Sequence, residues 1–165
     1  MNDAAALLIS KLRLEPLPGE GGFFAVTWTS AAKDPDGRPS GSAILFLITE
    51  ADFSALHRLR TDEIWHYHAG DPAELVQLDP GPPDCRIAVL GPDVEGGHVP
   101  QAVVPAGAWQ GARIRAGGPG TAHGWTLFGC TVSPAWDGKE FELGDRAALE
   151  KEFPAQAAII RALTR

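Results

Sequence analysis

Short runs of β-branched and aromatic residues, separated by turns rich in Pro and Gly, dominate the sequence between residues 25 and 132. The turns include DPDGRPSG, DPGPPD, GPDVEGG and GGPGTAHG, and the chain holds 19 Gly and 14 Pro. The predicted strands are 25–30, 42–49, 63–69, 73–78, 85–90, 101–106, 112–116 and 125–132. Short strands with frequent turns and almost no helix between them are typical of a sandwich or a barrel, so we expect an all-β fold.

Helical spacing of apolar residues occurs only near the two ends of the chain. Residues 3–13 predict a short amphipathic helix capped by Asp3. Asp145 is expected to cap a helix that begins at Arg146, and Pro154 to open a second short helix. Because the Pro- and Gly-rich stretches are too short to be linkers, residues 1–165 are interpreted as a single domain.

The charge and the cysteines exclude several functional classes. A formal net charge of -7 argues against nucleic acid and anionic membranes as partners, because both attract basic surfaces. Cys85 and Cys130 form no CxxC pair, which excludes a structural zinc site of that type. The N-terminus lacks the features of a signal peptide, and no run approaches the ~18 apolar residues of a membrane span. We therefore expect a cytoplasmic protein with reduced thiols.

The segment HRLRTDEIWHYHAGD (57–71) concentrates the ionisable residues of the chain. Side chains alternate between the two faces of a strand, so Glu63 and Tyr67 share a face with Trp65. His66 and His68 lie on the other face unless a bulge intervenes. The apparent histidine cluster is therefore divided, and His57 is the histidine that can join Glu63.

The spacing of His57, Glu63 and Gly70 fits the frame HxH(x)3E(x)6G, with Leu59 in place of the second His. This frame resembles the first motif of the cupin superfamily. The segment VPAGAWQGA resembles the second cupin motif, PxGxxH, with Gln110 in place of the His.

Four ordered blocks narrow the resemblance to the cupin family DUF985, also called Cupin_5. GEGGFF (19–24) resembles its PEGGYF turn, and HRLRTDEIWHYHAGDP (57–72) resembles its HR-x-x-x-DE-x-WH-x-x-AGDP block. PQAVVPAGAWQGA (100–112) and GCTVSPAWDGKEFEL (129–143) resemble the remaining two blocks. The sequence departs from the family at Pro18, at His68 and at the pair Ala135–Trp136.

The resemblance implies a double-stranded β-helix, the cupin or jelly-roll barrel, with short terminal helices. It also implies a homodimer and a small-molecule pocket in the barrel mouth that is lined by both motifs. Metal-binding cupins use two His and one Glu of the first motif and one His of the second. With Leu59 and Gln110 in two of these places, no cofactor is expected, and a weakly held divalent metal on His57, Glu63 and Gln110 is the alternative.

Without a metal, His57 and Glu63 are candidates for an acid/base pair that abstracts a proton beside a carbonyl. Some cupins epimerise nucleotide-linked keto sugars with a His base and a Tyr acid, which makes Tyr67 the candidate acid by analogy. The alternative is that His57 and Glu63 are a buried polar pair that orders the barrel. Candidate ligand contacts are Trp65, His66, Gln101, Trp109 and Gln110.

Three functional hypotheses follow from these residues. The first is a metal-independent epimerase or isomerase acting on a sugar- or carboxylate-like metabolite. The second is a non-catalytic sensor or storage barrel that binds a ligand. The third is a metal-dependent cupin lyase or dioxygenase. The sequence names no substrate and does not separate an enzyme from a binding protein.

Overall fold

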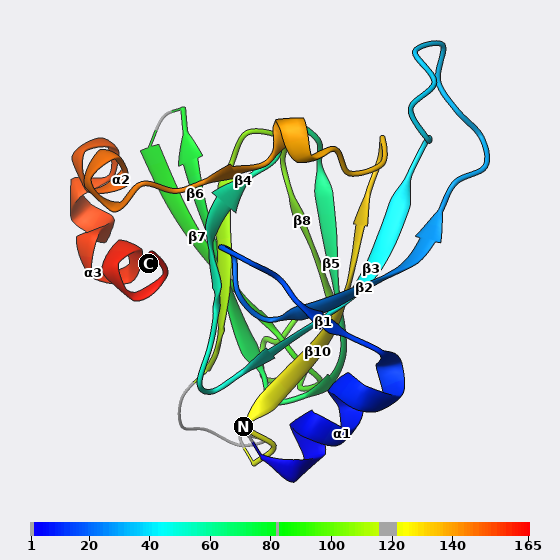
Figure 1. Ribbon diagram of the computed structural model, residues 1–165. Coiled ribbons are helices and arrows are strands. Elements are labelled where there is room, and N and C mark those ends of the chain that lie inside the picture. Colours follow the sequence, from blue (N-terminus) through cyan, green and yellow to red (C-terminus); the bar gives the residue numbers. More distant parts are fainter. Residues whose placement is uncertain (1, 82, 116–121) are drawn as a thin grey trace.

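The computed structural model describes residues 2–81, 83–115 and 122–165. Its strands form two antiparallel sheets, which face each other in Figure 1. The expected all-β double-stranded β-helix with short terminal helices is confirmed. The turn expected at 117–124 and the last residue of the strand expected at 112–116 fall mostly on residues outside the described ranges.

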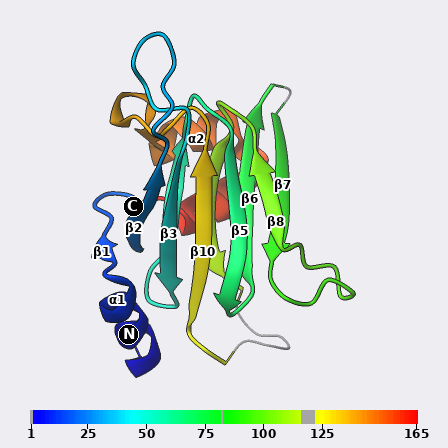
Figure 2. The ribbon, with the colours of Figure 1, turned by 90° about the vertical axis from the view of Figure 1, so that its right-hand side faces the viewer.

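The first sheet has the strand order β1-β2-β3-β10-β5-β8, and Figure 2 shows it face on. Its strands are β1 (Glu15–Pro16), β2 (Phe23–Thr29), β3 (Ser42–Thr49), β10 (Trp125–Val132), β5 (Glu63–Gly70) and β8 (Gln101–Val104). The central strand β10 pairs with both β3 and β5 along nearly its whole length. The inner faces of these strands contribute most of the first core cluster, which includes Phe46, Trp65 and Phe128.

The second sheet has the order β11-β4-β9-β6-β7. Its strands are β11 (Glu142–Leu143), β4 (Ser54–Arg58), β9 (Trp109–Ile114), β6 (Ala73–Pro80) and β7 (Pro83–Leu90). The helices α2 (Arg146–Glu152) and α3 (Ala157–Ala162) cover its outer face (Figure 1). A second core cluster lies between them, where Leu149, Phe153 and Ile160 pack with Leu56 and Leu78.

The N-terminal helix α1 (Asp3–Leu12) is capped by the residue one position before the predicted cap. The cap is Asn2, whose side chain accepts a hydrogen bond from the backbone N–H of Ala5, and Asp3 lies in the first helical turn. An acid in the first turn still interacts favourably with the positive end of the helix dipole. Asp145 caps α2 as expected. Among the described residues, no helix is long and apolar enough to cross a membrane.

Residues 133–141, called here the mouth segment, follow β10 and include the 3-10 helix η1 (Gly138–Glu140). In Figure 1 this segment runs over one end of the two sheets toward α2. Arg38 holds it in place, because its guanidinium donates to both carboxylate oxygens of Glu140 and its Nε donates to the Ala135 carbonyl. The end of the barrel beneath the mouth segment is where the candidate site lies.

Candidate functional site

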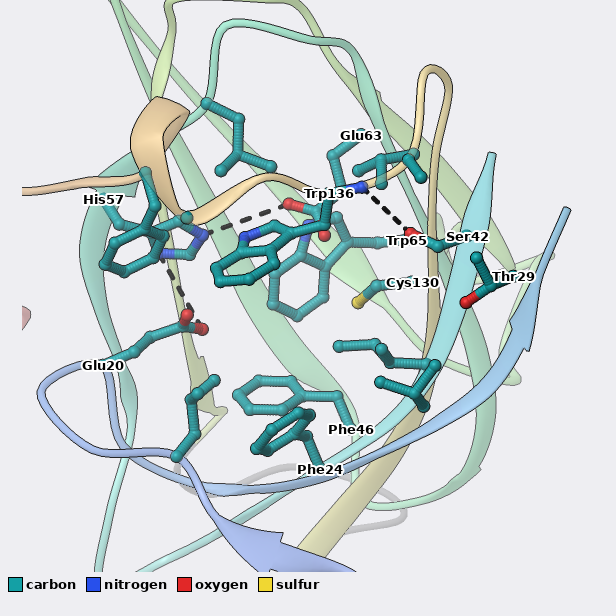
Figure 3. A pocket seen from close by; sticks show the side chains of 18 of the residues that line it. Glu20, Phe24, Thr29, Ser42, Phe46, His57, Glu63, Trp65, Cys130 and Trp136 are labelled. Atoms are coloured by element: carbon teal, nitrogen blue, oxygen red, sulfur yellow. Dashed lines mark hydrogen bonds and ion pairs between the residues drawn. The ribbon is translucent and has the colours of Figure 1, made fainter. Parts of the chain in front are cut away.

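A cavity of about 580 Å³ opens between the two sheets beneath the mouth segment (Figure 3). This volume is in the range of known small-molecule sites. Most of its lining is apolar and comes from β2, β3, β5, β10 and the mouth segment. The ionisable side chains that line it, Glu20, His57, Glu63 and the thiol of Cys130, come from four different parts of the chain.

His57 lies in β4, which pairs with β9 through Gln110 and with β11 through Leu143. Its side chain is buried, and its ring stacks on Phe141 with the ring centroids 5.3 Å apart. Its Nδ1 lies 2.8 Å from the carbonyl oxygen of Ala55. A carbonyl oxygen only accepts, so Nδ1 carries a hydrogen, and in the neutral ring Nε2 has the free lone pair.

Glu63 is the first residue of β5 and is buried beside Gln110. Gln110 Nε2 donates to Glu63 Oε2 at 2.5 Å, and Gln110 Oε1 accepts from the indole N–H of Trp65 at 2.8 Å. The indole N–H is a donor only, so it fixes the orientation of the Gln110 amide. The amide oxygen therefore faces Trp65, and the NH₂ group faces the carboxyl of Glu63.

Burial raises the pKa of Glu63 to about 7. The neighbouring His57 opposes this rise because its positive form stabilises the carboxylate, whereas Glu20 adds to it by repulsion. His57 Nε2 and Glu63 Oε2 are 4.0 Å apart. A group whose pKa lies near neutral can both donate and accept a proton under physiological conditions.

Glu20 is a site residue that the sequence analysis missed. It lies in the GEGGFF turn, where Gly21 and Gly22 have positive φ angles and a Cβ at Gly22 would meet the backbone of β3. Its Oε1 accepts from the Ser54 hydroxyl at 2.7 Å and lies 3.8 Å from Nδ1 of His57. His57 therefore lies between two buried carboxyl groups, as Figure 3 shows. The available signal was that Glu20 is the one ionisable residue of this block.

The described structure brings His57, Glu63, Trp65 and Gln110 together, but it leaves Tyr67 away from them. Tyr67 shares the inner face of the sheet with Glu63 and Trp65, as alternation predicts, but it packs against the first core cluster. Its hydroxyl donates to the Gly70 carbonyl at 2.7 Å. Tyr67 is not among the residues that line the cavity, so the geometry gives it no contact with a ligand bound there.

Four predicted ligand contacts are also absent from the lining of the cavity. Gln110 makes hydrogen bonds to Trp65 and Glu63, which do line it, and the other three lie elsewhere. Gln101 is exposed on β8, opposite His66 in the strand register. His66 lies on the outer face of the first sheet, with its Nε2 3.3 Å from the Thr131 hydroxyl. Trp109 belongs to the second core cluster, with the guanidinium of Arg58 4.5 Å from its ring centroid. Each of the last two neighbours an inward residue in sequence and therefore faces the opposite side of its sheet.

The donor set does not fit the metal centre of a metal-binding cupin. Leu59 lines the cavity at the place of the second histidine and offers no ligand atom. The Gln110 oxygen, its only ligating atom, is bonded to Trp65, and the Gln110 NH₂ group faces Glu63. Within residues 2–81, 83–115 and 122–165, no group of three or more His, Cys, Asp or Glu is placed to hold a metal ion. Gln110 is therefore better described as a hydrogen-bonded link between Trp65 and Glu63, with His57 Nε2 4.0 Å from the Glu63 carboxyl.

Cys130 lines the cavity from β10 and is almost fully buried. Burial raises the pKa of its thiol well above the ordinary value, and the carboxylates of Glu63 and Glu20 raise it further. A thiol with a raised pKa stays protonated near neutral pH and is a poor nucleophile. Cys130 therefore contributes to the wall of the cavity rather than to covalent chemistry.

A family model described as the cupin superfamily (DUF985), Cupin_5, matches residues 6–144. The chain belongs to this family. A hypothetical protein from Leishmania major is 36% identical, with a TM-score of 0.89 over 97% of this chain and 98% of that one. A protein from Shewanella oneidensis is 33% identical, with a TM-score of 0.88 over 100% and 99% of the two chains. No curated protein matches this chain.

More distant cupins share the fold alone. A cupin 2 conserved barrel domain protein from Rhodopseudomonas palustris is 17% identical, with a TM-score of 0.55 over 90% of this chain and 83% of that one. Cupin_5 membership supports a barrel that binds a small molecule, and it indicates no specific reaction. The case for an activity therefore depends on the cavity itself.

Proposed function

We propose that this cupin binds a small carbonyl compound in its cavity and moves a proton on it without a metal, as an isomerase or epimerase does. The observation that carries the proposal is the geometry of His57 and Glu63. The lone pair of His57 Nε2 and the carboxyl of Glu63 face each other across 4.0 Å at the wall of the cavity. That gap is longer than a hydrogen bond and leaves both groups free to act on a ligand.

In the proposed reaction, His57 Nε2 takes the proton from the carbon beside the carbonyl. Glu63, protonated in part because its pKa is about 7, donates a proton to the carbonyl oxygen, so that a neutral enol forms. Reversal of the two transfers returns the carbonyl. Rotation of the enol in the cavity, followed by return of the proton from His57 to the opposite face of the same carbon, gives the epimer. If that carbon carries a hydroxyl group, the intermediate is an enediol. His57 then returns the proton to the former carbonyl carbon, the Glu63 carboxylate takes the hydroxyl proton, and the isomer forms.

The acid role that sequence reasoning gave to Tyr67 passes to Glu63 in this proposal. The Tyr67 hydroxyl donates to Gly70, and burial raises its pKa above the ordinary value, which makes it a weaker acid. Ala55 and Gln110 support the two reacting groups, since one fixes the tautomer of His57 and the other fixes the carboxyl of Glu63. The Ala55 contact uses Nδ1 and leaves Nε2 of His57 available, and the Gln110 contact uses Oε2 of Glu63 and leaves Oε1 to carry the proton that is donated.

The second candidate is a non-catalytic barrel that binds its ligand. The apolar lining favours it, because few polar side chains are available to orient a reacting group. A binding barrel would hold the same ligands but would leave their carbon-bound hydrogens in place. Exchange of those hydrogens with solvent therefore separates the two candidates.

The test is the incorporation of solvent deuterium into aldehydes and ketones that raise the melting temperature of the protein. Mass spectrometry in D₂O should show exchange beside the carbonyl, and His57→Asn should slow it by about 100-fold or more. The Asn side chain can still donate to the Ala55 carbonyl but has no equivalent of Nε2. Glu74→Gln, a change of an acid that is paired with Arg113 and does not line the cavity, is the matched control and should exchange at the original rate. Ligands that bind without gaining deuterium would contradict catalysis.

A further inference from the structure

The side chains that form the walls of the cavity restrict the class of ligand further than the reacting groups do. Apart from Thr29 and Ser42, the lining beside His57 and Glu63 is formed largely by apolar and aromatic side chains from the first sheet, from the mouth segment and from residues just outside the strands. These side chains are Leu17, Phe24, Val26, Ile44, Phe46, Leu59, Trp65, Val132, Trp136 and Phe141. A sugar would leave its hydroxyl groups without partners against such walls, which is costly. An apolar body would gain from the same contact.

The charged groups in the cavity are all at one end, and two of the three are acids. Glu20 and Glu63 are carboxyl groups, and His57 lies between them. With one proton on the three groups the cluster has a net charge of −1, and with two protons it is neutral. It is positive only when all three groups are protonated.

No lysine or arginine is among the described residues that line the cavity. Arg38, which holds the mouth segment, makes its hydrogen bonds to Glu140 and to the Ala135 carbonyl. Arg58 is paired with Glu142 and lies over Trp109, outside the cavity. A carboxylate or phosphate that entered would lose its hydration and meet two acids without a cation to balance it.

From these observations we propose that the cavity takes an uncharged or cationic molecule with an apolar body and excludes carboxylates and phosphates. The polar head of the ligand lies against Glu20, His57 and Glu63, and the body lies between the two sheets. The exposed Trp136 covers the entrance and offers an aromatic face to the ligand. The inference deepens the proposed function, because it rests on the same cavity and names the class of molecule that enters it.

The test compares three probes with one apolar body and different heads: 4-phenylbutan-2-one, 4-phenylbutylamine and 4-phenylbutyrate. Their affinities are measured by isothermal titration calorimetry at pH 8, with the protein freed of bound metal. We expect the ketone and the amine to bind, and the carboxylate to bind at least about tenfold more weakly than either. Methyl glucoside, a probe with a polar body, should not saturate the protein at millimolar concentration.

The double variant Glu20→Gln with Glu63→Gln tests whether the two acids cause this selectivity. Glutamine keeps an oxygen that can accept from Ser54, so the turn is expected to keep its contact. In this variant the affinities for the amine and for the carboxylate should differ by no more than about threefold. The Glu74→Gln protein should keep the original selectivity, and Glu20→Gln alone gives the same comparison if the double variant does not fold.

Two outcomes overturn the inference. One is a carboxylate probe that binds as tightly as the amine, and the other is the absence of saturation by all three probes. Neither depends on turnover, so the result is separable from that of the deuterium experiment. If the charge selectivity is found and no ligand gains deuterium, the ligand class stands and the catalytic proposal fails.

Discussion

At the scale of single residues, burial sets the pKa of Glu63 against the opposing hydrogen bond from Gln110. Gln110 stands in the place of the histidine of the second cupin motif and keeps a polar group there. It directs its NH₂ group at the carboxyl of Glu63. A donor of this kind stabilises the carboxylate, yet burial outweighs it and leaves the pKa of Glu63 raised to about 7. The site therefore holds an acid that ionises near neutral pH.

This raised pKa predicts a pH dependence of stability. Between its ordinary value of 4.5 and about 7, the unfolded chain has lost the Glu63 proton while the folded protein keeps it. The contribution of Glu63 to the free energy of unfolding is therefore greatest below pH 4.5, falls as the pH rises, and levels off above about 7. Glu63→Gln cannot ionise, so its stability relative to the original protein should increase by about 3 kcal/mol between pH 4.5 and pH 8. Urea denaturation of both proteins across this range measures the difference, and parallel curves would show that Glu63 ionises normally.

At the scale of elements, β4 is the longest of the strands that the sequence did not predict, the others being the two-residue strands β1 and β11. Ala55, Leu56 and His57 are all buried, because β4 lies between the cavity on one side and the C-terminal helices on the other. A strand buried on both faces lacks the apolar–polar alternation from which strands are recognised. The function of the strand is clear only in the fold, where it places His57 opposite Gln110.

The mouth segment is the second element that matters for function. Arg38 holds it through the Ala135 carbonyl and the Glu140 carboxylate, and Trp136 is further held by a hydrogen bond from its backbone N–H to the Ser42 hydroxyl at 3.0 Å. These contacts order the segment over the ligand site without a covalent link. Loosening them should affect ligand binding more than overall stability.

The variant Arg38→Met tests this role of the mouth segment. Loss of the ion pair should lower the free energy of unfolding by no more than about 1 kcal/mol, because both partners are partly exposed. Amide hydrogen exchange in residues 135–141 should become faster, and 4-phenylbutylamine should bind several-fold more weakly. Arg161→Met, which breaks the ion pair with Glu150 in the C-terminal helices, serves as the control and should change neither measurement. Unchanged exchange in the Arg38 variant would mean that other contacts hold the segment.

At the scale of the whole molecule, four sequence blocks were sufficient to predict the barrel and its family, and they brought Glu63, His57 and Gln110 to one place. The blocks did not predict how far along the barrel each side chain lies. Tyr67 lies four residues after Glu63 on the same face, which is about 13 Å farther along the strand and beyond the cavity. Glu20 was missed for a related reason, since its approach to His57 depends on how a glycine turn folds back over β3.

The central claim is that the proton transfer on a bound carbonyl compound requires His57 and Glu63 and no metal ion. The most direct measurement is the rate of deuterium incorporation into a bound ketone by protein from which metal has been removed by chelation and verified by mass spectrometry. The account predicts that the rate is unchanged by chelation and unchanged by added zinc, iron or manganese. A rate that disappears with the metal and returns when one of these ions is restored would contradict it.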